Sequence, residues 1–277
     1  MKKLLWIALC FVSLTLHAQV DRLDSLLSDL IYDDIDLLDG QDAERYDFVY
    51  LGTAYSNRTF YAGREVGDGM MNQSWYAYYY GACGLFAGAS GAWYDGLTPA
   101  YSSTSLSVGY GGYFSDSKRV AYRFSYSRYL YHDEVVADES LYQNNINVGL
   151  SYRKGWFGAR GGVNYLFGDE QKLGFYGALY SRLKLAGFGA QNALFMVPEV
   201  SAFVGKEWVN VTRDGQLVYD ELYGLMNTQV IIPLEVSLGN FDVEVSGVAN
   251  FPFTRDELVS YPASLYLMMS VGYVFGF

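Results

Sequence analysis

The stretch that decides the fold is the end of the chain, LYLMMSVGYVFGF, residues 265–277. Its apolar residues recur with a period of two, which is typical of a β-strand because successive strand side chains point to opposite faces. One face carries only large apolar side chains: Leu265, Leu267, Met269, Val271, Tyr273, Phe275 and Phe277. The other face is mixed and includes Ser270, Gly272 and Gly276. The first face is more apolar than an ordinary sheet face needs to be.

Composition narrows the environment in which such a strand is stable. The 277 residues include 27 Tyr, 17 Phe and 30 Gly, but only 5 Pro. Beyond the first residues, no window approaches the roughly 20 apolar residues of a membrane helix. A closed β-barrel is the remaining way to cross a bilayer, because every backbone polar group must find a partner there.

Alternation recurs along the chain in short segments that are divided by turn residues. We expect about twelve strands, at 46–56, 74–81, 85–94, 102–114, 118–131, 142–153, 156–167, 172–185, 192–205, 225–238, 241–251 and 263–277. A β-sandwich would also alternate, but short links here take turns with long ones, as in transmembrane barrels. An even number of strands puts both chain ends on the periplasmic side. The sequence therefore predicts an all-β fold, a transmembrane antiparallel β-barrel.

Two connections invite a more specific expectation. The segment Asn57–Tyr61 is suited to extend the first strand beyond the membrane. In the long link 207–224, Arg213-Asp214-Gly215-Gln216 is a hairpin turn signal, which favours an external ribbon.

The chain divides into three parts. Residues 1–18 have two lysines, an apolar run and Ala18, which is the pattern of a secretory signal peptide. Residues 19–45 form an acidic periplasmic leader that is a short amphipathic helix, a segment that enters the barrel or a solvated segment. Residues 46–277 form the barrel.

The barrel portion resembles the outer-membrane β-barrel proteins of Gram-negative bacteria, in their porin-like class, without matching one functionally defined member. The resemblance rests on the signal peptide and on the terminal Phe277, preceded by Phe275, Tyr273 and Val271. In that family this pattern is the signal that the barrel assembly machinery recognises. The resemblance implies a location in the cell outer membrane, with lipid and lipopolysaccharide as partners.

Charged side chains that alternation directs into the lumen are the candidate functional residues. We expect a lumen constriction made by Arg123, Arg160, Arg182, Lys184, Glu199, Glu235, Asp242 and Glu244. With basic groups on one wall and acidic groups on the other, a transverse field would orient polar solutes and discriminate among ions. The preferred function is a narrow porin-like channel for small polar solutes or ions.

Two alternatives remain open. Small barrels often fill their interior with side chains, so a closed barrel that serves in structure or surface recognition is the first. The second is a lipid-modifying enzyme, which would need a serine close to His132. The His-x-Ser-x-Asn-Gly pattern of outer-membrane phospholipases is absent, because Asp133 and Glu134 follow His132. We therefore expect no enzyme and assign no catalytic residue.

The cysteine count and the net charge exclude several other classes of protein. Beyond the signal peptide only Cys83 remains, so an internal disulfide is excluded. A net charge of −11 argues against nucleic acid as a partner. No metal site or cofactor is expected. The aromatic runs Trp75–Tyr80 and Trp93-Tyr94 are interpreted as interfacial girdles, in preference to a surface that guides sugars.

Overall fold

The computed structural model describes residues 47–61, 63–65, 69–115, 117–132, 142–189, 192–213 and 216–277. The predicted signal peptide and the acidic leader lie outside these residues, so both stay predictions. Within the described part of the chain, no helix is long and apolar enough to cross a membrane.

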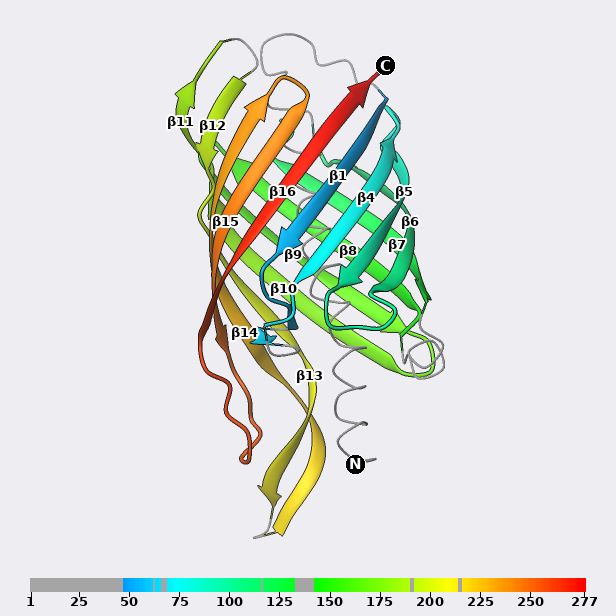
Figure 1. Ribbon diagram of the computed structural model, residues 1–277, viewed down its shortest axis with the longest axis vertical. Coiled ribbons are helices and arrows are strands. Elements are labelled where there is room, and N and C mark those ends of the chain that lie inside the picture. Colours follow the sequence, from blue (N-terminus) through cyan, green and yellow to red (C-terminus); the bar gives the residue numbers. More distant parts are fainter. Residues whose placement is uncertain are drawn as a thin grey trace.

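The regular structure of the described residues consists of strands (Figure 1). Their bounds are β1 Phe48–Ser56, β2 Phe60–Tyr61, β3 Arg64–Glu65, β4 Asn72–Tyr80, β5 Leu85–Tyr94, β6 Tyr101–Tyr113, β7 Val120–Tyr131, β8 Asn144–Lys154, β9 Phe157–Phe167, β10 Gln171–Ser181, β11 Leu183–Gly187, β12 Asn192–Met196, β13 Glu199–Arg213, β14 Gln216–Leu238, β15 Phe241–Pro252 and β16 Ser264–Gly276. All of them belong to one large sheet except β2 and β3, which form a small hairpin.

The large sheet closes on itself as an antiparallel barrel. It contains 14 strands, and the pairing of β14 with β15 closes the ring. Only Arg182 separates β10 from β11, and only Val197 and Pro198 separate β12 from β13. Each of these pairs is one interrupted strand, so the ring is a closed barrel of 12 strands. The predicted all-β barrel of about twelve strands is confirmed.

The first and last strands of the ring meet along one seam. β1 pairs with β16 from Phe48 opposite Gly276 to Ser56 opposite Met268. The N–H of Phe277 donates to the carbonyl oxygen of Asp47 at 3.0 Å. Both ends of the barrel portion therefore lie at the same end of the barrel (Figure 1), which we call the inner end.

The last strand has the two faces that its sequence predicts. Leu265, Leu267 and Met269 are 74%, 56% and 50% exposed and lie on the outside. Their neighbours Tyr266, Met268 and Ser270 are half-buried on the inside. Apolar side chains are exposed on the outer face of the other strands as well, which produces the apolar belt of a membrane-spanning barrel.

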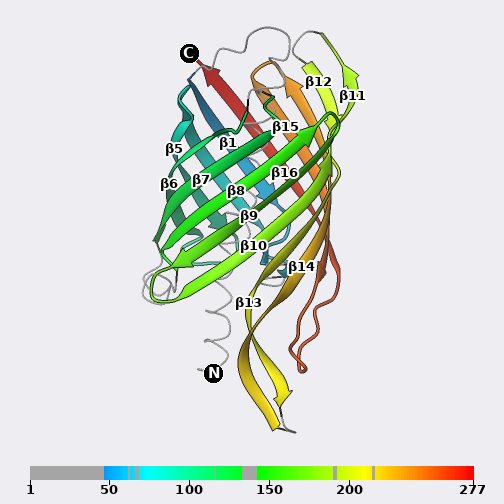
Figure 2. The same cartoon turned by 180° about the vertical axis from the view of Figure 1, so that it is seen from behind.

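The connections differ between the two ends of the barrel (Figure 2). At the inner end the strands are joined by tight turns, and Gly84, Gly155 and Gly239 have φ values of 91°, 61° and 60° there. A positive φ costs glycine little because it has no Cβ. At the opposite, outer end, β13 and β14 stay paired to Arg213 opposite Gln216. The predicted 207–224 link is thus a projecting two-stranded ribbon.

The expected extension of the first strand is wrong. β1 ends at Ser56, and Asn57 turns back toward β16. The N–H of Asn57 donates to the carbonyl oxygen of Leu267 at 3.2 Å, and the N–H of Leu267 donates to Oδ1 of Asn57 at 2.9 Å. These two bonds anchor the chain to its neighbour, so it leaves the wall instead of continuing along it.

Candidate functional site

Aromatic side chains pack on the inner face of β1, β4 and β5. The aromatic cluster comprises Tyr50, Tyr76, Tyr78, Tyr80 and Phe86, all of them buried. Its rings are in contact: Tyr50 and Tyr76 stack with their centroids 5.5 Å apart, and Tyr80 and Phe86 are tilted with their centroids 5.4 Å apart.

This cluster corrects the interpretation of the aromatic runs as girdles. Trp75, Tyr79 and Trp93 do lie on the exposed outer face. Tyr76, Tyr78, Tyr80 and Tyr94 are buried instead. Alternation explains the difference, because successive residues of one strand cannot all face the lipid. Gly52 makes room for the ring of Tyr76, since a Cβ at Gly52 would overlap that ring.

Small polar side chains line the inner face of β6 to β9. The buried members are Ser103, Ser105, Ser125, Ser127, Asn145, Asn147 and Asn164. Hydroxyl groups meet across the strands, as where Oγ of Ser107 lies 2.8 Å from Oγ of Ser127. This side of the interior therefore offers hydroxyl and amide groups, opposite in character to the aromatic cluster.

Charged side chains form ion pairs along the next part of the barrel wall, from β9 to β14. Arg160 on β9 forms an ion pair with Glu199, the first residue of β13. Nη1 of Arg182, between β10 and β11, lies 3.4 Å from Oε2 of Glu235 on β14. Each pair spans one intervening strand of the ring. Both pairs therefore run along the wall and do not cross the barrel axis.

The four other predicted constriction residues are placed less uniformly. The guanidinium of Arg123 lies 4.6 Å from the ring centre of Phe86, above the aromatic cluster. Asp242 accepts a hydrogen bond from Ser237 and interacts electrostatically with Arg182. Glu244 accepts a hydrogen bond from Ser246. Lys184 is exposed near the inner end, where the pairing of β11 with β12 is irregular.

The expectation of a basic wall opposed to an acidic wall is wrong for the paired residues. The basic strands β7, β9 and β10 and the acidic strands β13, β14 and β15 occupy adjoining arcs of the ring. Opposite charges meet where the two arcs join, at Arg160 with Glu199 and at Arg182 with Glu235. Nearby opposite charges shorten the range of their combined field, so a transverse field across the whole lumen does not follow.

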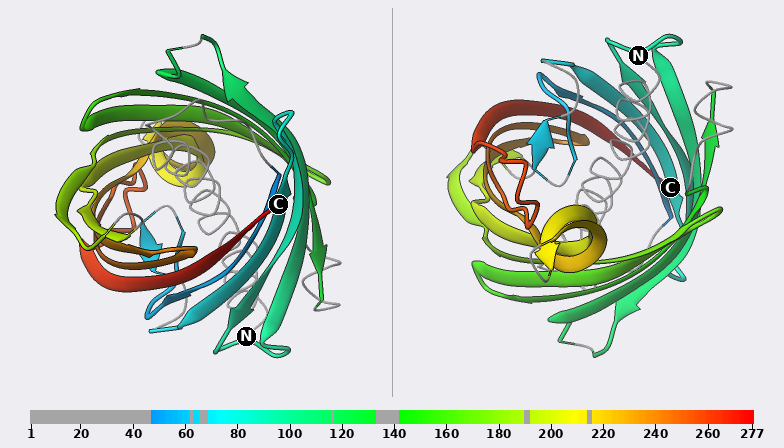
Figure 3. Two further views of the ribbon diagram at one scale, coloured as in Figure 1. Left: turned by 90° about the horizontal axis from the view of Figure 1, so that it is seen from above. Right: turned by 90° about the horizontal axis from the view of Figure 1, so that it is seen from below.

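The outer mouth contains a feature that sequence reasoning missed. The hairpin of β2 and β3 folds into the ring of strands (Figure 3). Phe60 is buried and stacks on Tyr266 of β16 at 4.5 Å between ring centres. Because Tyr266 faces the interior, this contact fixes the hairpin inside the mouth.

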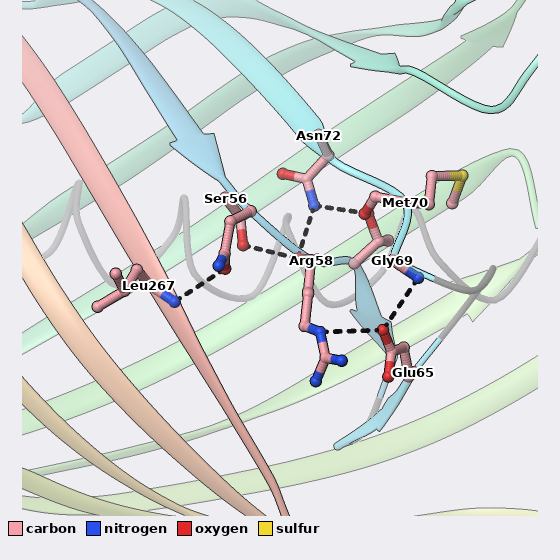
Figure 4. A network of polar contacts seen from close by, with 9 residues as sticks. Ser56, Arg58, Glu65, Gly69, Met70, Asn72 and Leu267 are labelled. Atoms are coloured by element: carbon pink, nitrogen blue, oxygen red, sulfur yellow. Dashed lines mark hydrogen bonds and ion pairs between the residues drawn. The ribbon is translucent and has the colours of Figure 1, made fainter.

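A polar network shapes the base of this hairpin (Figure 4). Nε of Arg58 lies 3.2 Å from Oε1 of Glu65, which also accepts the N–H of Gly69 at 3.2 Å. Oγ1 of Thr59 donates to the carbonyl oxygen of Met70, and Nδ2 of Asn72 donates to Oγ1 of Thr59, each at 2.8 Å. The segment is thereby held as a compact loop.

Arg64 ties the hairpin to strands that are distant in the ring. Nη2 of this buried residue lies 2.6 Å from Oε1 of Glu207 on β13. The same nitrogen donates to the carbonyl oxygen of Phe253 at 3.0 Å. The guanidinium also lies 4.5 Å from the ring centre of Tyr261. Arg64 therefore joins β3, β13 and the segment between β15 and β16 across the mouth.

We call the β2–β3 hairpin with its contacts through Arg64 the strap. The only sequence signal for this strap is indirect. The connection between the first two barrel strands, from Asn57 to Met71, is much longer than a turn requires. It carries two arginines and aromatic residues, but the pairing of Arg64 with Glu207 depends on the closed ring. Long-range contact of this kind is invisible to local periodicity.

His132 lies at the outer end of β7, and the centre of its ring is 4.9 Å from the ring centre of Tyr101. Its Nε2 is 2.9 Å from Oγ1 of Thr104, with the proton position depending on the tautomer. Asp133 and Glu134 lie outside the described residues. Among the described residues, no three His, Cys, Asp or Glu side chains lie together in a group that could hold a metal ion.

Comparison with solved structures bears on the fold. The outer-membrane channel COG4313 from Pseudomonas putida F1 superposes with a TM-score of 0.50 at 8% identity, covering 85% of this chain and 99% of its own. The chain therefore shares the antiparallel β-barrel fold of that structure. With its apolar belt, this fold places the protein in the outer membrane.

Two further structures are similar at lower TM-scores. They are the KdgM porin, with a TM-score of 0.49, 9% identity and coverage of 82% of this chain and 99% of its own, and the translocator domain of the autotransporter NalP from Neisseria meningitidis, with 0.46, 12%, 95% and 99%. No protein-family model matches the sequence, and no curated protein is similar to it.

Proposed function

We propose that this outer-membrane barrel is a narrow porin-like channel for small polar solutes or ions. The observation that carries the proposal is the direction of the ion pairs. Arg160 with Glu199, and Arg182 with Glu235, are joined along the wall and not across the axis. A barrel closed by its charges would place partners on opposite sides, whereas charges paired along one wall line a passage.

The polar strip of serine and asparagine side chains supports the same function. These groups exchange hydrogen bonds with a passing solute without binding it as a fixed charge would. The strap at Arg64 narrows the outer mouth, which suits small solutes. Selectivity then depends on the wall pairs and on Arg64 with Glu207.

The test is conductance of the refolded protein, without the signal peptide, in a planar bilayer. We expect discrete steps, and we expect Glu235→Gln to shift permeability toward anions because the wall loses the negative charge nearest to Arg182. A unit charge about 10 Å from an ion in water changes the energy of the ion by about 0.4 kcal/mol, or about twofold in relative permeability. Glu221→Gln is the matched control, because Glu221 pairs with Lys206 on the projecting ribbon, outside the barrel wall.

The result that contradicts the channel is silence from protein shown to be folded and inserted. The chain should be tested both whole and without residues 19–45, so that a leader cannot be the cause. Silence of both forms would favour the second candidate, a closed structural barrel. The buried aromatic cluster and the strap in the mouth are the observations that favour that alternative.

We propose no catalytic role for His132. Nucleophilic catalysis needs a base held by a third group, and the described contacts of the imidazole are with Thr104 and the ring of Tyr101. The predicted role of Val271, Tyr273, Phe275 and Phe277 in assembly is a separate proposal, supported by their position on the last strand of the ring.

A further inference from the structure

The ribbon of β13 and β14 projects well beyond the barrel wall (Figures 1 and 2). The projecting part pairs Gly205 with Gly224 at its base and Arg213 with Gln216 at its tip. At about 3.3 Å per residue, nine residues of strand reach about 30 Å. This length carries the tip far past the hydrocarbon layer, into the space above the outer leaflet.

A β-bulge decides which side chains the ribbon presents. Phe203 pairs with Asn227 and Val204 with Leu225, so Met226 is the extra residue on β14. An extra residue reverses the alternation of the strand beyond it. The odd-numbered residues of β14 from Leu225 to Leu217 therefore share a face with Trp208, which keeps the outward direction of β13.

The outer face of the ribbon is unusually apolar for a projecting element. Its exposed apolar members are Trp208 at 53%, Leu217 at 53%, Tyr219 at 65%, Tyr223 at 38% and Leu225 at 39%. The rings of Trp208 and Tyr219 stack with their centres 5.4 Å apart, so the two rings form one contiguous aromatic patch. Large exposed apolar patches on a soluble surface mark interaction sites.

This face is continuous with the lipid-facing belt of the barrel. Val200, nearer the membrane on the same face of β13, is 51% exposed. The ring of Tyr223 lies 6.5 Å from that of Phe175, an outward residue of β10. The surface that meets lipid along the wall therefore extends onto the ribbon, which stands where the outer-leaflet headgroups extend.

The charges on this face limit the kinds of ligand that it can bind. Nζ of Lys206, at the base of this face, lies 2.7 Å from Oε2 of Glu221, so this cation is already paired. A paired cation is a poor anchor for a phosphate, whereas flat aromatic rings with a polar edge suit the apolar faces of sugars. The free edge of β13 is covered by the chain's own residues, because the N–H of Asn210 donates to Oδ2 of Asp256 and the N–H of Thr212 to Oε1 of Glu257, each at 3.0 Å.

We propose that the outer face of the ribbon binds the core saccharide of lipopolysaccharide in the outer leaflet. Trp208 and Tyr219 stack on sugar rings, and Tyr223 and Leu225 join this contact to the lipid belt. The site is separate from the channel and does not depend on conduction through the lumen.

The experiment follows the fluorescence of Trp208 in refolded protein, with Trp75, Trp93 and Trp156 changed to Phe, in lauryldimethylamine oxide micelles. Rough-type lipopolysaccharide, which carries core sugars, is titrated in one arm and lipid A, which lacks them, in the other. We expect the emission of Trp208 to respond to the first and not to the second. Tyr219→Ala with Leu217→Ala should weaken binding about tenfold through the loss of a stacked ring and its neighbour.

Val218→Ala is the matched control, because Val218 lies on the opposite face of the ribbon and is 40% exposed. It should bind as the parent does, and all variants are compared only when they migrate as folded barrels. Equal responses to lipid A and to rough lipopolysaccharide, or equal binding by the Tyr219 variant, would overturn the proposal. A response that depends on protein concentration alone would assign the face to a second copy of the chain instead.

Discussion

The inner and outer ends of this barrel are built from different kinds of interaction. At the inner end, tight turns join neighbouring strands, and side chains such as Asp47, which accepts the N–H of Ala82 at 2.6 Å, add to the backbone ladder. At the outer end, one hairpin enters the mouth and one ribbon leaves it, and side chains from other parts of the ring hold both, Glu207 for the hairpin and Asp256 for the ribbon. The inner end therefore maintains the ring, whereas the outer end is free to carry specific contacts.

The largest expected loss of stability comes from a change on the aromatic side of the barrel wall. A Cβ at Gly88 would overlap the carbonyl oxygen of Ala77 and the ring of Tyr78. We expect Gly88→Val to cost more than about 3 kcal/mol, because backbone cannot yield as a flexible side chain can. The fraction of folded barrel is measured by mobility in unheated gels after refolding.

Gly247→Val is the control for that change, because a Cβ at Gly247 meets nothing within 4 Å. It should fold as the parent does. Equal folding of the two variants would show that the wall yields more than the packing of Tyr78 suggests.

Release of the strap should affect the outer mouth and leave the ring intact. Arg64→Met leaves the carboxylate of Glu207 with Thr254 Oγ1, at 3.1 Å, but without its cation. We expect the strap to lose about 2 kcal/mol of local stability, which is less than the loss for a fully buried ion pair. We also expect larger conductance steps, because the mouth becomes wider. Proteolysis within residues 57–71 should become faster at the same time.

Arg213→Met is the matched control, since its ion pair with Asp220 is at the exposed ribbon tip. An exposed pair contributes less than about 1 kcal/mol, so neither conductance nor cleavage should change. Unchanged conductance in the Arg64 variant, despite faster cleavage of the loop, would mean that the strap does not limit the passage.

The smallest effect concerns the clasp between the ribbon and the segment 253–263. Hydrogen bonds from the hydroxyl and the N–H of Thr212 hold the pKa of Glu257 below its ordinary value. A carboxylate with a lowered pKa stabilises the clasp above its unfolded pKa, and that stability is lost as pH falls through the folded pKa. We expect faster exchange of the Thr212 amide at pH values below about 4, after correction for intrinsic rates.

Glu257→Gln should show the faster exchange at neutral pH and a weaker dependence on pH. The rest of the barrel should keep its protection in both cases, because the clasp lies outside the ring. Protection of the Thr212 amide that is the same at pH 7 and pH 3 would contradict the role of the carboxylate.

Sequence patterns predicted the wall of the barrel well because the wall is periodic. The alternation at 265–277 already separates Leu265 from Tyr266, and the same rule places Arg160 and Glu199 inside. In the run Trp75–Tyr80, consecutive aromatic residues conceal this alternation. The buried positions of Tyr76, Tyr78 and Tyr80 follow from the same alternation once it is applied there.

Features that depend on closure could not be predicted in this way. Arg64 meets Glu207 only because the ring brings β3 near β13. The pairing of Arg160 with Glu199 likewise depends on the order of strands in the ring, because β10 lies between their two strands. The bulge at Met226 inserts one residue into a regular pattern, and nothing in the local sequence marks it.

The seam between β1 and β16 has a consequence for how the chain is made. Phe48–Ser56 is synthesised first among the barrel strands, and its partner Ser264–Gly276 is synthesised last. One edge of the first hairpin must therefore stay unsatisfied throughout translation and transit, which makes it the element most in need of a chaperone. Closure is then a single late event, and a peptide with the sequence of residues 265–277 would compete for the waiting edge and leave an open sheet.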